Sequence, residues 1–118
     1  MMLSQQELHN LAMKTVGDSL KENGFEFLTV NSKLKKDPQF VCLKEKKLHF
    51  FIVRAFKYPD NPKIFNKVLL TKVKQHAEKF NALTYFAGVG LANSENYEQP
   101  IQKNKPYVIN FDGWFPVN

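Results

Sequence analysis

The chain has little cysteine, and it lacks any long apolar run. Its 118 residues include one cysteine, Cys42, which excludes a disulfide within one chain and a cysteine-based metal cluster. A reduced cytoplasmic compartment is the simplest interpretation. No segment approaches the roughly 18 apolar residues of a membrane span, and the N-terminus has neither a basic region nor a long apolar stretch. We therefore expect a soluble protein without membrane insertion.

Arginine is almost absent as well. Arg54 is the one arginine among 17 basic residues, which exceed the 11 acidic ones and give a net charge of +6. This charge favours either a solvated lysine-rich surface or weak, non-specific binding to nucleic acid. Because lysine makes no planar bidentate contacts, the solvated surface is the better interpretation. Composition selects neither a protein partner nor an oligomeric state.

Glycine is scarce, with five residues, and the one glycine-rich spot is Gly88-Val89-Gly90. It lacks the third glycine and the lysine of phosphate-binding loops, so we interpret it as a bend or bulge that ends a strand. No cofactor motif is present. The histidines His9, His49 and His76 have no acidic or cysteine neighbour at ligand spacing, and His76 is expected to be a packed core residue.

Apolar residues make up 43% of the chain and aromatic residues 14%, which is enough for one hydrophobic core. We therefore expect a single domain over residues 1–118. Ser4 and Glu7 form a capping-box pattern, and apolar residues then recur at helical spacing up to Gly24. A second helix is expected with Asn61 as its N-cap and Pro62 at its first position. Strands are expected at residues 25–31, 40–43, 48–56, 83–89 and 106–111.

The strand at residues 48–56 is apolar on both faces, which is typical of a central strand covered on both sides. The expected architecture is therefore α/β: a mixed β-sheet flanked by helices on both faces, in the order α-β-β-β-α-β-β. The strand–helix–strand crossover makes the strands before and after the second helix parallel.

Residues 38–56, PQFVCLKEKKLHFFIVRAF, together with this element order, resemble the core of the PD-(D/E)xK nuclease-like superfamily, which has the restriction-endonuclease-like fold. In active members, an Asp after the Pro and a second acid two residues before a Lys hold a divalent metal. With Pro38 on the family's Pro, the resemblance implies Gln39, Ile52 and Arg54 at these three positions. Without carboxylates at the first two, we expect no metal site and no catalytic residue.

The resemblance also implies a partner for Arg54, because a buried guanidinium must be paired. The family's first helix often carries an acid near the site, so Glu7 is the leading partner and Glu26 the alternative. The degenerate cleft then comprises Gln39, Ile52, Arg54 and Glu7. Arg54 acts there either as a structural clamp or as an anion-recognition residue.

The lysines of two turns are candidates for polyanion binding. They form one patch or two at the ends of the strand at residues 40–43, and they are Lys33, Lys35 and Lys36 in the loop before it and Lys44, Lys46 and Lys47 in the turn after it.

The chain also resembles a group of small proteins that take their name from the flavin- and cluster-bearing subunit of the sodium-translocating NADH–quinone reductase. The iron–sulfur cluster of that enzyme needs four cysteines, and its flavin–NADH module needs a longer chain. We therefore expect neither the cluster nor the flavin-dependent activity in this chain. We expect a non-catalytic intracellular binding module with a degenerate nuclease-like fold. The alternative is a divergent metal-dependent nuclease or a nucleic-acid-binding protein.

Overall fold

Helix α1 (Gln5–Glu22) begins at the capping box that the sequence predicts. The Ser4 hydroxyl accepts a hydrogen bond from the Glu7 N–H at 3.1 Å, and the Glu7 carboxylate accepts one from the Ser4 N–H at 2.9 Å. The helix ends before Gly24, whose φ of 82° is a conformation that glycine adopts without strain. Both ends of α1 are therefore determined by local sequence.

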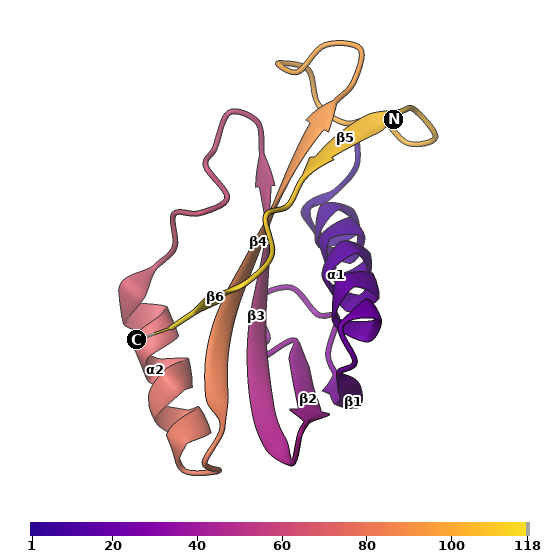
Figure 1. Ribbon diagram of the computed structural model, residues 1–118. Coiled ribbons are helices and arrows are strands. Elements are labelled where there is room, and N and C mark those ends of the chain that lie inside the picture. The colour runs from indigo at the N-terminus through magenta and orange to yellow at the C-terminus, as the bar shows by residue number, and fades with distance from the viewer. Residues whose placement is uncertain (118) are drawn as a thin grey trace.

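The computed structural model describes residues 1–117, and Figure 1 shows them as a six-stranded sheet with α1 on one side and α2 on the other. The strand order is β1-β2-β3-β4-β5, and β6 pairs with β4. Among residues 1–117, β3 and β4 are the one parallel pair of neighbouring strands. The elements after α1 are β1 (Glu26–Val30), β2 (Phe40–Lys44), β3 (Lys47–Lys57), α2 (Lys67–Glu78), β4 (Leu83–Asn93), β5 (Tyr107–Asn110) and β6 (Phe115–Pro116).

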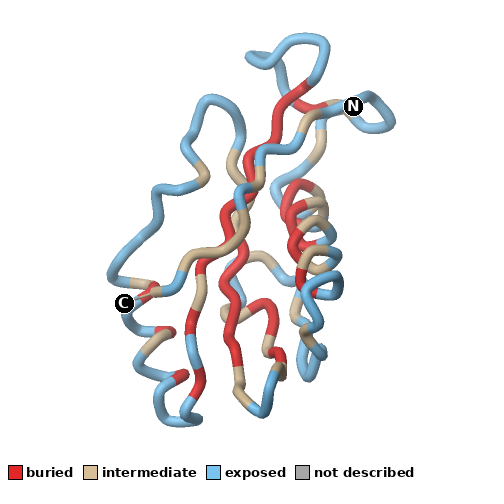
Figure 2. Tube along the Cα trace, viewed as in Figure 1, coloured by how far each residue is buried: buried red, intermediate tan, exposed pale blue. Residues whose placement is uncertain are grey.

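Alternate residues of β3 face the two helices. Phe51 and Val53 pack in the cluster under α1, whereas Ile52 packs with Leu70 and Phe86 under α2. Figure 2 shows burial along the middle of β3 and along most of β4. The predicted α/β class, with a mixed sheet and two helices, is thus confirmed.

Two boundaries differ from the prediction by several residues, and one strand is additional. Helix α2 begins at Lys67 with Asn66 as its cap, not at Asn61, because the segment around Pro62 packs against β4. A Cβ added at Gly88 would lie 1.9 Å from the Pro62 carbonyl oxygen, so glycine is required there. Accordingly Gly88 does not end the strand, and β4 continues to Asn93. The short strand β6 is additional.

No helix within residues 1–117 combines the length and the apolar character needed to cross a bilayer.

Candidate functional site

The region that the sequence singles out lies where β3 continues beyond the end of β2. The last β2–β3 pair joins Phe40 to Phe51, and β3 then runs on to Lys57. At Val53, side chains replace the missing strand. The Val53 N–H donates to Gln39 Oε1 at 2.7 Å, and the Val53 carbonyl accepts from Arg54 Nη1 at 2.9 Å.

Asp37 joins these two side chains into one network. Arg54 donates from Nη1 to Asp37 Oδ1 at 2.8 Å and from Nη2 to Asp37 Oδ2 at 2.7 Å, and Gln39 Nε2 also donates to Oδ1 at 2.8 Å. The Gln39 side chain is fully buried, and the side chains of Arg54 and Asp37 are 17% and 7% exposed. A planar guanidinium matched to a carboxylate in this way is a strong, directional pair.

This network controls the charge of Asp37. Burial alone would raise the pKa of the Asp37 carboxyl, but the hydrogen bonds from Arg54 and Gln39 outweigh burial and hold that pKa below its usual value. Asp37 is therefore ionised at neutral pH, and its charge is neutralised by Arg54. Arg54 acts as a clamp between the loop before β2 and the free edge of β3.

Helix α1 brings a third ionisable group to the network. His9 is fully buried, and neither ring nitrogen has a hydrogen-bond partner among residues 1–117. Burial lowers the pKa of His9, and the nearby charge of Arg54 lowers it further, while Asp37 opposes both effects. His9 is thus a neutral imidazole beside an ion pair.

The residues that the nuclease resemblance implies at metal-ligand positions form structural contacts instead. Gln39 accepts the hydrogen bond of the Val53 N–H at the sheet edge, and Ile52 is fully buried in the core under α2. Within the described part of the chain, no three His, Cys, Asp or Glu side chains come together as metal ligands would. Asp37 is the one carboxylate in the network, and it is occupied by Arg54.

The pairing expected for Arg54 is wrong. The Glu7 carboxylate caps the start of α1, and Glu26 is exposed on β1. Asp37 takes their place because the loop before β2 passes along the edge of β3, and a helix-capping carboxylate is already satisfied by the backbone. No local pattern in the sequence marks Asp37, which lies two residues before Gln39, as the partner of Arg54.

The other titratable candidates do not form a site. His76 is exposed beside Phe80, so its expected place in the core is wrong. Cys42 is fully buried, and burial raises the pKa of its thiol to about 12. A thiol with that pKa is not a nucleophile near neutral pH. His9 was missed as a site residue, although its helical spacing from Ala12 and Met13 places it on the buried face of α1.

The candidate lysines lie at opposite ends of β2. Lys33, Lys35 and Lys36 are exposed in the loop before it. In the turn after it, Lys46 is exposed, and Lys44 and Lys47 face each other as a half-buried pair. Lys44 Nζ lies 4.8 Å from the centre of the Phe25 ring. The lysines therefore form two groups, of which the first is the freer to bind.

A model of one protein family, described as a domain of unknown function (DUF8840), matches residues 6–117. The chain therefore belongs to the DUF8840 family. Neither the curated proteins nor the solved structures include a match to it.

Proposed function

We propose that this protein is a non-catalytic binding module of the cytoplasm with a degenerate PD-(D/E)xK-like fold. The observation that carries the proposal is the commitment of Gln39, Ile52 and Asp37 to structural contacts. Gln39 hydrogen bonds the β3 backbone, Ile52 fills the core and Asp37 is paired with Arg54. A metal-dependent nuclease needs carboxylates that are free to bind a hard cation, because that cation stabilises the charge that builds on the phosphate.

The order of elements supports the family part of the proposal. Helix α1, three strands, helix α2 and the parallel strand β4 follow one another as in the superfamily's core. The buried, reduced Cys42 agrees with a cytoplasmic location. The short strands β5 and β6 add to this core along one edge of β4.

Titration calorimetry with Mg²⁺ and Mn²⁺, together with a plasmid-cleavage assay in each metal, tests the proposal. We expect no saturable metal binding and no cleavage. Saturable binding that Asp37→Asn abolishes would identify Asp37 as a metal ligand and would refute a purely structural role for it.

A second candidate is a nucleic-acid-binding function, which the exposed lysines of the loop before β2 favour. Lys33, Lys35 and Lys36 form no salt bridge among residues 1–117, so their charges are available to phosphates. Such binding should weaken steeply with salt, because each neutralised phosphate releases counterions.

A further inference from the structure

The edge of β3 remains open beyond the Gln39 network. In a strand, the N–H and C=O groups of alternate residues point to the same edge. The groups of Val53 point away from β4 and are bonded by Gln39 and Arg54, so those of Ala55 and Lys57 point the same way. Among residues 1–117, the Ala55 N–H, the Ala55 carbonyl and the Lys57 N–H have no hydrogen-bond partner on that edge. Unpaired groups of this kind are a template for an added strand.

A hollow runs beside this edge. It has a volume of about 200 Å³ and is lined by Ala55 and Lys57 of β3, by Leu8 of α1, and by Leu34 and Lys35 of the loop before β2. Its outer wall is fastened to α1, because the Gln6 side chain donates to the Ser32 carbonyl at 2.8 Å and accepts from the Leu34 N–H at 3.1 Å. The space is thus formed without a bound partner.

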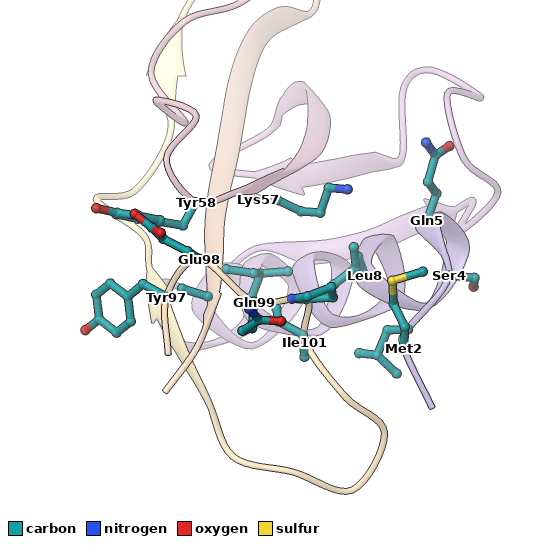
Figure 3. Close-up of a pocket in the computed structure, with 14 residues that line it drawn as sticks. Met2, Ser4, Gln5, Leu8, Lys57, Tyr58, Tyr97, Glu98, Gln99 and Ile101 are labelled. Carbon is teal, nitrogen blue, oxygen red and sulfur yellow. The ribbon is translucent and has the colours of Figure 1, made fainter. Parts of the chain in front are cut away.

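A second, larger hollow of about 400 Å³ continues from the first and shares Gln5, Leu8 and Lys57 with it. Figure 3 shows its lining side chains, which come from the start of α1, the end of β3 and residues 97–101. Tyr58 and Tyr97 meet here in an edge-to-face pair with ring centres 5.3 Å apart. Leu8, Leu91 and Ile101 line the hollow beside these rings, together with the acidic Glu98, and its apolar part accepts a large apolar side chain.

The charges around the first hollow are mostly positive. Lys35 and Lys57 line it, and Lys33 and Lys36 are exposed on the same loop. None of these four lysines forms a salt bridge among residues 1–117, and Asp60 is the one acidic residue in the lining. An occupant with negative charge is therefore favoured over a neutral or basic one.

We propose that this groove binds an acidic peptide segment in an extended conformation, which adds a strand to β3 at Ala55 and Lys57. The peptide backbone forms hydrogen bonds with the unpaired N–H and C=O groups of the β3 edge. The peptide carboxylates face Lys35 and Lys57, and an aromatic side chain of the peptide enters the hollow beside Tyr58. A helical ligand would leave the edge groups of β3 unpaired. The inference rests on the proposed binding function and specifies the partner.

Nuclear magnetic resonance with a defined probe tests the proposal. The probe is a seven-residue peptide that alternates Glu and Val and has Phe as its central residue. One control replaces every Glu by Lys, and another carries N-methyl groups on alternate backbone nitrogens, which blocks strand pairing. We expect the probe alone to shift the Ala55 and Lys57 amide signals and to slow amide exchange at Ala55 by at least about tenfold.

Charge-reversal variants give a second measurement. Lys35→Glu and Lys57→Glu are each expected to weaken probe binding by about five- to tenfold at low salt, whereas Lys72→Glu on α2 leaves it unchanged. Thermal unfolding of each variant verifies that the fold is retained. Equal binding of the N-methylated peptide, binding that leaves the Ala55 and Lys57 signals unmoved, or no binding at millimolar peptide would overturn the proposal.

Two further outcomes are distinguishable. Concentration-dependent shifts of the Ala55 and Lys57 signals without peptide would assign the edge to a second copy of the chain and would also overturn the proposal. Failure of the peptide test leaves the metal titration unaffected, whereas saturable binding of Mg²⁺ or Mn²⁺ would refute the non-catalytic function itself.

Discussion

The Arg54 guanidinium and the Asp37 carboxylate form two parallel hydrogen bonds, of 2.8 and 2.7 Å, across the gap between the loop before β2 and the edge of β3. The pair is mostly shielded from water, and Arg54 also bonds the Val53 carbonyl. Removing either partner would leave the other charge buried and unpaired. The loss of stability should therefore be larger than when both partners are removed together.

Arg54→Met is therefore expected to reduce the free energy of unfolding by about 3–5 kcal/mol, because it leaves the buried Asp37 carboxylate without its charged partner. Asp37→Asn combined with Arg54→Met should recover part of this loss. Urea unfolding of the two single variants and the double variant measures the coupling between them. Additive losses would show that the pair contributes nothing as a pair.

His9 predicts a dependence of stability on pH. Its pKa is lowered in the folded state, so the folded protein keeps a neutral imidazole while the unfolded chain binds a proton below about pH 6.5. Stability is therefore full above about pH 6.5 and is lost as the pH falls through the folded pKa, with a slope of up to about 1.4 kcal/mol per pH unit. Asp37, whose pKa is also lowered, adds a loss of the same sign below about pH 4.

His9→Leu should flatten part of this slope below about pH 6.5. The remaining part belongs to His49, whose pKa is also lowered by burial. At pH 8 the variant should be as stable as the parent or more so, because neither buried ring nitrogen of His9 has a hydrogen-bond partner among residues 1–117. Urea midpoints at a series of pH values test this, and an unchanged slope would contradict it.

Ile52→Glu introduces a carboxylate where the nuclease resemblance implies the second acid, yet we expect no metal-dependent cleavage. The side chain is fully buried under α2, so the substitution should cost several kcal/mol, on the order of an unpaired buried charge. Ile64→Glu is a matched control, because Ile64 is 67% exposed. Unfolding and plasmid cleavage are measured for both. An Ile52→Glu variant as stable as the control would be evidence of a polar site.

Nucleic-acid binding, if present, should be weak and sensitive to salt. We expect duplex DNA to bind with a dissociation constant of about 10⁻⁴ to 10⁻⁶ M at physiological salt, without preference for sequence. Replacing Lys33, Lys35 and Lys36 by Gln should reduce the slope of log affinity against log salt by up to about 2.7, roughly 0.9 for each phosphate that is no longer neutralised. Fluorescence anisotropy measures the dissociation constant and its salt dependence. Tight binding that discriminates between sequences would contradict this prediction and would favour nucleic-acid binding as the main function.

Local signals in the sequence predicted much of the fold. The capping box of α1 depends on Ser4 and Glu7 alone, and the two-sided burial of β3 follows from its unbroken apolar pattern. The start of α2 was wrong because Pro62 is fixed by contact with Gly88, which lies on a distant strand. The helix propensity of the local sequence does not predict a contact between segments that are far apart in the chain.

The candidate site was less predictable for the same reason. The positions of Gln39 and Arg54 followed from an alignment of motifs, but the partner of Arg54 depends on the path of a loop. Asp37 reaches Arg54 across 17 positions of sequence, and nothing in the local pattern distinguishes it from Glu7. His9 was missed because a single polar residue on an apolar helix face carries no signal of what it will lie against.

The parallel pairing at the centre of the sheet also has a consequence for how the chain folds. Pairs such as His49 with Leu83 and Lys57 with Leu91 lie 34 positions apart, and the segment between β3 and β4 includes α2. The β2–β3 hairpin, in contrast, closes around Glu45 and Lys46. Closing the longer loop reduces chain entropy before the contacts between β3 and β4 can offset that loss. We therefore expect the encounter of β3 with β4 to limit the rate of folding, and we expect the β2–β3 hairpin to form and unfold many times before that encounter.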